Sequence, residues 1–158
     1  MKPTIALGGG LAGAATITLI HEAVKRIVPN APRMDILGMD ALSKVMKNAG
    51  KNPPKEKQLY AWTMAGDVLS NSLYYSLAGI GKEKNALLKG SLLGLAAGVG
   101  AVLLPKPLGL NEAHSNRTTS TKLMTVALYF AGGLMTAAVL KALHKKQQKK
   151  AKDYVYEI

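Results

Sequence analysis

Apolar residues in this chain gather into four long windows that are separated by polar and basic runs. A hydrocarbon core about 30 Å thick needs roughly 20 mostly apolar residues in a helix, so each window is close to the length of a membrane span. The third window contains Lys89, whose long side chain can reach the interface. The windows are Thr4–Ile20, Leu59–Ile80, Leu87–Leu104 and Leu123–Leu143.

The lack of a polar stripe favours membrane helices over a soluble bundle. The stretch GSLLGLAAGVGAVLLP (90–105) has no polar side chain after Ser91, whereas a soluble amphipathic helix needs a polar face. We therefore predict an all-α integral membrane protein, a helical bundle with four transmembrane helices. We place the spans at about 4–26, 59–80, 87–104 and 123–143, within one transmembrane domain of residues 1–144.

Residues 34–49, between the first two windows, have the pattern of an amphipathic helix. Such a helix can lie in the headgroup region, or it can pack its methionine-rich face on a span or on a partner, and both readings stay open. The short turn GKEKN (81–85) predicts that the spans on either side of it are antiparallel neighbours. At about 100° per residue, one face of the amphipathic helix holds Met34, Met39, Leu42, Val45, Met46 and Ala49.

The chain carries a formal net charge of +12, and its basic residues flank the apolar windows. Anionic lipid headgroups attract such residues by about 1 kcal/mol each, so we expect lipid contacts and no nucleic-acid binding. A basic C-terminal tail (145–158) favours both termini on the cytoplasmic side of a bacterial cytoplasmic membrane. The tail residues expected to contact headgroups or a partner are Lys145, Lys146, Lys149 and Lys150.

Glycines recur on the predicted spans at spacings typical of tight helix contact. This glycine-zipper pattern allows two backbones to approach closely, within one chain or between chains. Intramolecular packing is the favoured reading, and a homo-oligomer or a larger membrane complex is the other. The glycines are Gly9 and Gly13 in the first span, Gly90, Gly94 and Gly98 in the third, and Gly132 and Gly133 in the fourth.

A carboxyl group lies in the second span, about 12 Å from its start at 1.5 Å per residue. Helical spacing places Asp67, Ser70, Asn71 and Tyr74 on one face. A carboxylate at this depth costs several kcal/mol and usually faces the bundle interior, so burial favours its protonated form. The favoured reading is hydrogen bonding that fixes the register of the bundle, and the alternative is a proton or small-cation site.

His21 and Glu22 end the first span, where they are possible partners of Asp67. Glu22 and Arg26 are four residues apart and can form an ion pair on the helix surface. A proton relay between His21 and Asp67, or a carboxylate–histidine metal site with Glu22, is the less favoured alternative. Consecutive residues point about 100° apart, so His21 and Glu22 are poorly placed to bind one ion.

The functional prediction follows from these features. The sequence contains no cysteine, no histidine spacing of the HExxH kind and no phosphate-binding loop, so we expect neither enzymatic activity nor a cofactor or bound metal. The pattern favours a non-catalytic membrane subunit or scaffold that packs through its glycine faces. The alternative is a small transporter centred on Asp67. A polar cavity that reaches Asp67 would favour the transporter. Tight packing around Asp67 without water would favour the subunit.

Overall fold

The computed structural model describes the backbone of residues 1–156 and their side chains, except those of Lys150 and of residues 154–156. Over this part of the chain the fold is helical and contains no strand, as predicted. Two 3-10 turns, η1 (Leu77–Gly79) and η2 (Glu83–Asn85), follow the third helix. The α-helices are α1 (Pro3–Ile27), α2 (Met34–Asn48), α3 (Glu56–Ser76), α4 (Ala86–Leu103), α5 (Ala113–Asn116) and α6 (Thr119–Tyr156).

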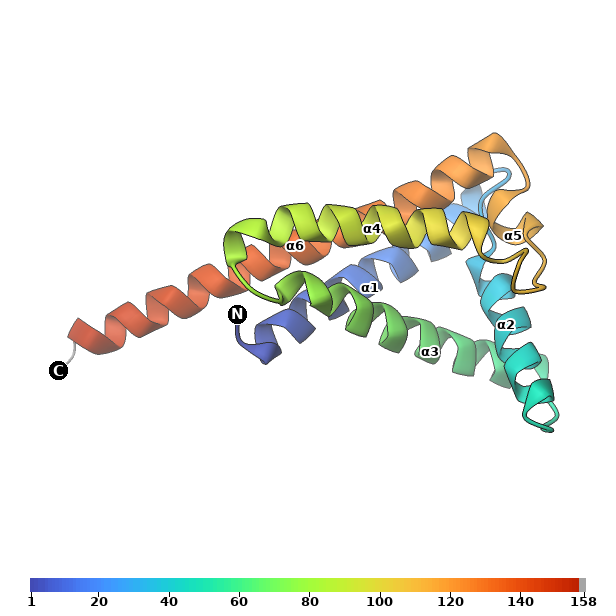
Figure 1. Cartoon of the computed structure of the whole chain (residues 1–158), viewed down its shortest axis with the longest axis horizontal. Coiled ribbons are helices and arrows are strands. Elements are labelled where there is room, and N and C mark those ends of the chain that lie inside the picture. The colour runs from blue at the N-terminus through green and yellow to red at the C-terminus, as the bar shows by residue number, and fades with distance from the viewer. Residues whose placement is uncertain (157–158) are drawn as a thin grey trace.

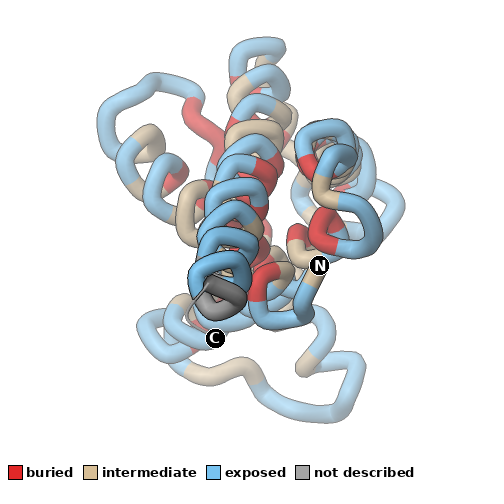
Figure 2. Tube along the Cα trace, turned by 90° about the vertical axis from the view of Figure 1, so that its left-hand side faces the viewer, coloured by how far each residue is buried: buried red, intermediate tan, exposed pale blue. Residues whose placement is uncertain are grey.

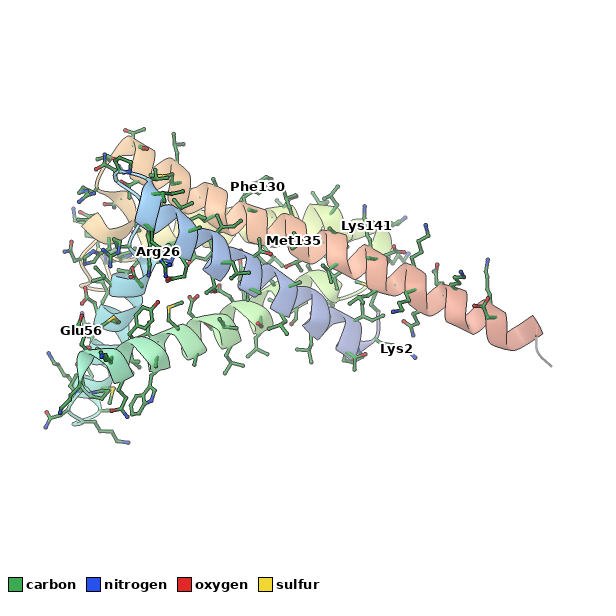
Figure 3. All side chains as sticks on the ribbon, turned by 180° about the vertical axis from the view of Figure 1, so that it is seen from behind. Lys2, Arg26, Glu56, Phe130, Met135 and Lys141 are labelled. Atoms are coloured by element: carbon green, nitrogen blue, oxygen red, sulfur yellow. The ribbon has the colours of Figure 1, made fainter. Side chains whose placement is uncertain are left out.

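The four long helices α1, α3, α4 and α6 run alternately in opposite directions, and α2 crosses one end of them (Figure 1). Helix α1 packs between α3 and α6, and α4 packs against α6. The described ends of the chain lie away from α2. Figure 3 shows Arg26 and Glu56 near α2 and Lys2 at the opposite end.

Helices α3 and α4 are antiparallel, as the short turn predicted, but they diverge from that turn toward α2 (Figure 1). The reason is that each helix packs on a different neighbour, α3 on α1 and α4 on α6. At the α1–α3 contact, a methyl group added to Gly10 would lie 2.8 Å from the backbone nitrogen of Ser76. The divergence leaves space between α3 and α4 at the end covered by α2.

Three helical segments are long and apolar enough to cross a membrane: Pro3–Ile27, Glu83–Leu103 and Thr119–Asp153. Helix α3, which contains most of the second predicted span, is not one of them, because Asp67, Asn71 and several serines and tyrosines lower its hydropathy. Figure 2 shows buried positions where helices face one another and exposed positions on the outside. Many of the exposed side chains are large and apolar, which is consistent with a membrane protein.

The glycines singled out in the sequence lie at contacts between helices of this chain. On α4, a methyl group added to Gly98 would lie 2.7 Å from the Cα atom of Val126 on α6. On α1, one added to Gly9 would lie 2.6 Å from the Leu140 side chain. At these glycines the backbone of one helix therefore lies so close to the backbone or a side chain of the next helix that a Cβ atom would not fit. The same holds for Gly13, Gly90, Gly94, Gly132 and Gly133.

The residues predicted as a basic tail continue the last helix. Helix α6 has 38 residues, which corresponds to about 57 Å at 1.5 Å per residue, and its C-terminal part projects beyond the other helices (Figure 1). Lys145, Lys146 and Lys149 are exposed on this projection. The side chain of Lys150 lies outside the described residues.

Candidate functional site around Asp67

Asp67 lies in the middle of α3, partly buried, with one side-chain partner among the described residues. Asn71, one helical turn later, donates a hydrogen bond from Nδ2 to Oδ1 of Asp67 at 2.9 Å. The Ser70 hydroxyl instead donates to the backbone carbonyl of Asp67, and the Tyr74 hydroxyl donates to the Leu93 carbonyl on α4 at 3.0 Å. The predicted cluster therefore shares one side of the helix, but only Asn71 binds the carboxyl group.

A first cavity of about 270 Å³ lies between α1, α2 and α3 and borders Asp67. Two of its lining hydroxyls, those of Thr18 and Thr63, are buried without a hydrogen-bond partner in the described part of the chain. Thr63 is only 8% exposed. Buried polar atoms are normally hydrogen-bonded, so these hydroxyls are available to water or to a bound polar group.

A second, more open cavity of about 550 Å³ lies between α3 and α4. Its polar lining residues are Asp67, Ser70, Asn71, Tyr74 and Tyr129. Its apolar walls come from α2, α4 and the loop after α4. Asp67 and Tyr129 line both cavities, as do Met34, Gly38 and Ser70, so the two hollows adjoin one another at Asp67.

His21 borders the first cavity together with Asp67 but forms no direct hydrogen bond with it. Its Nε2 atom lies 3.0 Å from the Pro32 carbonyl oxygen and 3.3 Å from the Met34 backbone nitrogen. A proton relay from His21 to Asp67 would therefore need an intervening water in the cavity.

Glu22 forms ion pairs with neighbouring basic residues of α1. It pairs with Arg26 at 3.4 Å, as the four-residue spacing predicted, and it also binds Lys25. In the described part of the chain, no group of three or more His, Asp or Glu side chains is placed to hold a metal ion. Of the two residues, His21 lines the first cavity and Glu22 does not.

A buried ion-pair network ties α1, α2 and α3 together beside the first cavity. Asp35, 5% exposed, accepts two hydrogen bonds from Arg33 and one from Lys25, all at 3.0 Å. Lys25 continues to Glu22, which also accepts a hydrogen bond from the Tyr60 hydroxyl. Burial by itself raises the pKa of Asp35, but the bonds from Arg33 and Lys25 outweigh it and hold that pKa well below its usual value.

The sequence offered weak signals for several residues at this site. Asp35 is acidic in the first turn of a helix, where a negative charge is favourable, and this pattern could have drawn attention to it. Tyr129 lies inside an apolar window, and Thr18 and Thr63 are ordinary helix residues. Their roles depend on how separate helices pack, which local spacing does not contain.

The ionisable groups that border the two cavities come from four helices. They are His21 on α1, Asp35 on α2, Asp67 and Tyr74 on α3, and Tyr129 on α6. Because Asp35 is neutralised by its own cations, Asp67 is the acid in this set that lacks a basic partner. Comparison with protein families, with characterised proteins and with solved structures finds no match.

Proposed function

We propose that this chain is a four-span membrane protein that binds a proton, or a small cation in exchange for one, at Asp67. The fourth span in this proposal is α3. Its 21 residues correspond to about 32 Å at 1.5 Å per residue, enough for a hydrocarbon core. Its side chains Leu69 and Leu73 are exposed and apolar, and they line neither cavity. Its low hydropathy therefore comes largely from the side that borders the cavities.

The proposal assigns α2 to the headgroup region, with its inner face over the cavities. Met34 and Gly38 of α2 border both cavities, whereas Lys47 is exposed. This arrangement suits an amphipathic helix at an interface. The two termini then lie on one side, which we assign to the cytoplasm of a bacterial cell because of the lysines on α6.

The observation that carries the proposal is that Asp67 lines two adjoining cavities. A carboxyl group at membrane depth is favoured as the neutral acid until water or a cation compensates its charge. The free hydroxyls of Thr18 and Thr63 are neutral oxygen ligands of the kind that could assist such a cation. Asn71 donates to Asp67 through its amide, which holds the carboxyl group in place when it loses its proton.

Reconstitution in liposomes tests the proposal. We expect proton or cation flux in the wild type and its loss in Asp67→Asn, which keeps the shape but cannot release a proton. A matched control is Asp40→Asn, because Asp40 lies on α2 with 45% of its side chain exposed. Flux should persist in that control. Equal, negligible flux in all three proteins would contradict the proposal.

A second candidate function is a non-catalytic subunit or scaffold, and the projecting end of α6 favours it. The exposed lysines there would bind anionic headgroups or an acidic partner, each contributing about 1 kcal/mol near an anionic surface. The glycine faces are occupied within the chain, so they do not provide this docking surface. Replacing Lys145, Lys146 and Lys149 with glutamine should release a partner that co-purifies with the wild type. Unchanged co-purification would argue against this candidate.

A further inference from the structure

The second cavity is much larger than a proton or a metal ion requires. Its volume of about 550 Å³ lies within the range of roughly 300 to 1,000 Å³ that is typical of sites for small organic ligands. Its walls are largely apolar and include Ala97, Gly100 and Ala101 of α4. Such walls do not solvate an inorganic ion, whereas they fit an organic group.

Charge complementarity identifies the kind of organic group. Among the described residues, Asp67 is the single acidic residue that lines the second cavity, and no Lys, Arg or His lines it. Two aromatic rings, those of Tyr74 and Tyr129, border the same space, and aromatic faces attract cations. A cavity with one carboxyl group, aromatic neighbours and apolar walls is complementary to a hydrophobic cation with a single charge.

The position of the cavity indicates how such a cation enters. Helices α3 and α4, which both line it, diverge toward α2 (Figure 1), and α1 and α6 lie behind them. The outward residues Leu69 of α3 and Leu95 of α4 are exposed and apolar. A ligand dissolved in the bilayer would therefore reach Asp67 sideways, between these two helices.

We propose that the ligand exchanged at Asp67 is a hydrophobic organic monocation that enters the second cavity from the bilayer between α3 and α4. This inference rests on the function proposed above and names the ligand class for the same site. The exchange balances in charge. The cation pairs with the Asp67 carboxylate without forming a covalent bond, and the proton released from the carboxylic acid passes to water in the first, more polar cavity.

Tetraphenylphosphonium is a suitable probe, with triphenylphosphine oxide as its neutral counterpart. Purified full-length protein in lipid nanodiscs would be titrated in weak buffer, following probe binding and proton release together. We expect saturable binding of the cation with about one proton released per cation, and no saturable binding of the neutral compound. The fluorescence of Trp62, the sole tryptophan of the chain and a residue lining the first cavity, provides an independent readout.

Three variants locate the site. Asp67→Asn should weaken cation binding more than tenfold and abolish proton release. Ala101→Phe, which fills the second cavity from α4, should also weaken binding more than tenfold. The matched control is Val99→Phe, on the same helix but exposed and not lining the cavity, and it should bind like the wild type. Thermal unfolding would confirm that each variant is folded, and Asp67→Asn decides the question should Ala101→Phe fail to fold.

The outcomes separate this inference from the proposed function. Cation binding that is equal in the wild type and Asp67→Asn would overturn the inference, because it would reflect partition into lipid. Flux of protons or sodium that depends on Asp67, without saturable binding of tetraphenylphosphonium, would also overturn it and leave the proposed function intact. If neither flux nor cation binding depends on Asp67, both the inference and the proposed function are overturned.

Discussion

Two carboxyl groups on the inner side of this fold have opposite surroundings. Asp35 binds Arg33 and Lys25 and is therefore suited to remain ionised. Asp67 has the neutral amide of Asn71 as its side-chain partner in the described part of the chain. A buried carboxylate that is paired with cationic side chains serves mainly to hold helices together. A carboxyl group that has no cationic partner can instead exchange its proton for a cation. The contrast explains why we assign a structural role to Asp35 and the exchange site to Asp67.

We expect Asp35→Asn to lower the free energy of unfolding by about 3 kcal/mol at neutral pH. Removing one partner of a buried ion pair leaves the other charge uncompensated, which typically costs about 3 to 5 kcal/mol. We expect the lower end of this range because Lys25 keeps its ion pair with Glu22 and the side chain of Arg33 is about half exposed. Chemical unfolding in detergent micelles measures the difference. A difference below about 0.5 kcal/mol would show that the network is not stabilising.

The difference in unfolding free energy between wild type and Asp35→Asn should depend on pH, which tests whether lost charge pairing causes it. The pKa of Asp35 is lowered in the folded protein by Arg33 and Lys25, despite the opposing effect of burial. The stabilisation is therefore complete above the unfolded pKa, near 3.8, and is lost as the pH falls below it toward the folded pKa. The gap between wild type and Asp35→Asn should narrow below about pH 4. A gap independent of pH would point to altered packing instead of lost charge pairing.

At the scale of elements, small residues decide which helices pack together. Gly94 and Gly98 bring α4 against the α6 backbone, and Gly10 brings α1 against α3. None of the glycines in the described part of the chain makes a comparable close approach between α3 and α4, although a short turn connects these helices. The opening between these two helices is therefore a consequence of where the glycines lie.

Gly94→Ala should destabilise the contact between α4 and α6 by about 1 to 3 kcal/mol, the usual cost of overpacking. The added methyl group would lie 2.8 Å from the Tyr129 carbonyl oxygen and 2.9 Å from Cα of Phe130, and neither backbone atom can move alone. Gly66→Ala is the matched control, because no atom lies within 4 Å of its added methyl group. That variant should be stabilised by up to about 1 kcal/mol through helix propensity. Unfolding midpoints of the two variants should therefore move in opposite directions.

The sequence predicted the helices and the unusual acid, but not how the helices meet. Hydrophobic windows and helical spacing are local properties, so they located the long helices and placed Asp67 beside Asn71. Spacing did not reveal that the Tyr74 hydroxyl binds Leu93, or that Thr18 and Tyr129 border the same space as Asp67. Those facts depend on the packing of separate helices. The short turn also predicted closer neighbours than α3 and α4 are, since packing on other helices outweighs the connection.

At the scale of the whole molecule, the number of crossings depends on α3. Three segments meet the length and composition of a span, and with three crossings the chain ends would lie on opposite sides of the membrane. If α3 also crosses, they lie on the same side. Figure 3 shows Lys2 and Lys141 toward the same end of the bundle, away from Arg26 and Glu56. This arrangement leads us to expect four crossings.

Single cysteines can decide this topology, because the natural sequence contains none. Lys2→Cys and Lys149→Cys should react with a membrane-impermeant maleimide from the same side, and Asn48→Cys, at the end of α2, from the other. All three positions are exposed, so a permeant maleimide should label each and serve as the control. Labelling of Lys2→Cys and Lys149→Cys from opposite sides would mean that α3 does not cross. Asp67 would then lie nearer the headgroups, where a carboxylate is readily hydrated and needs no exchange partner.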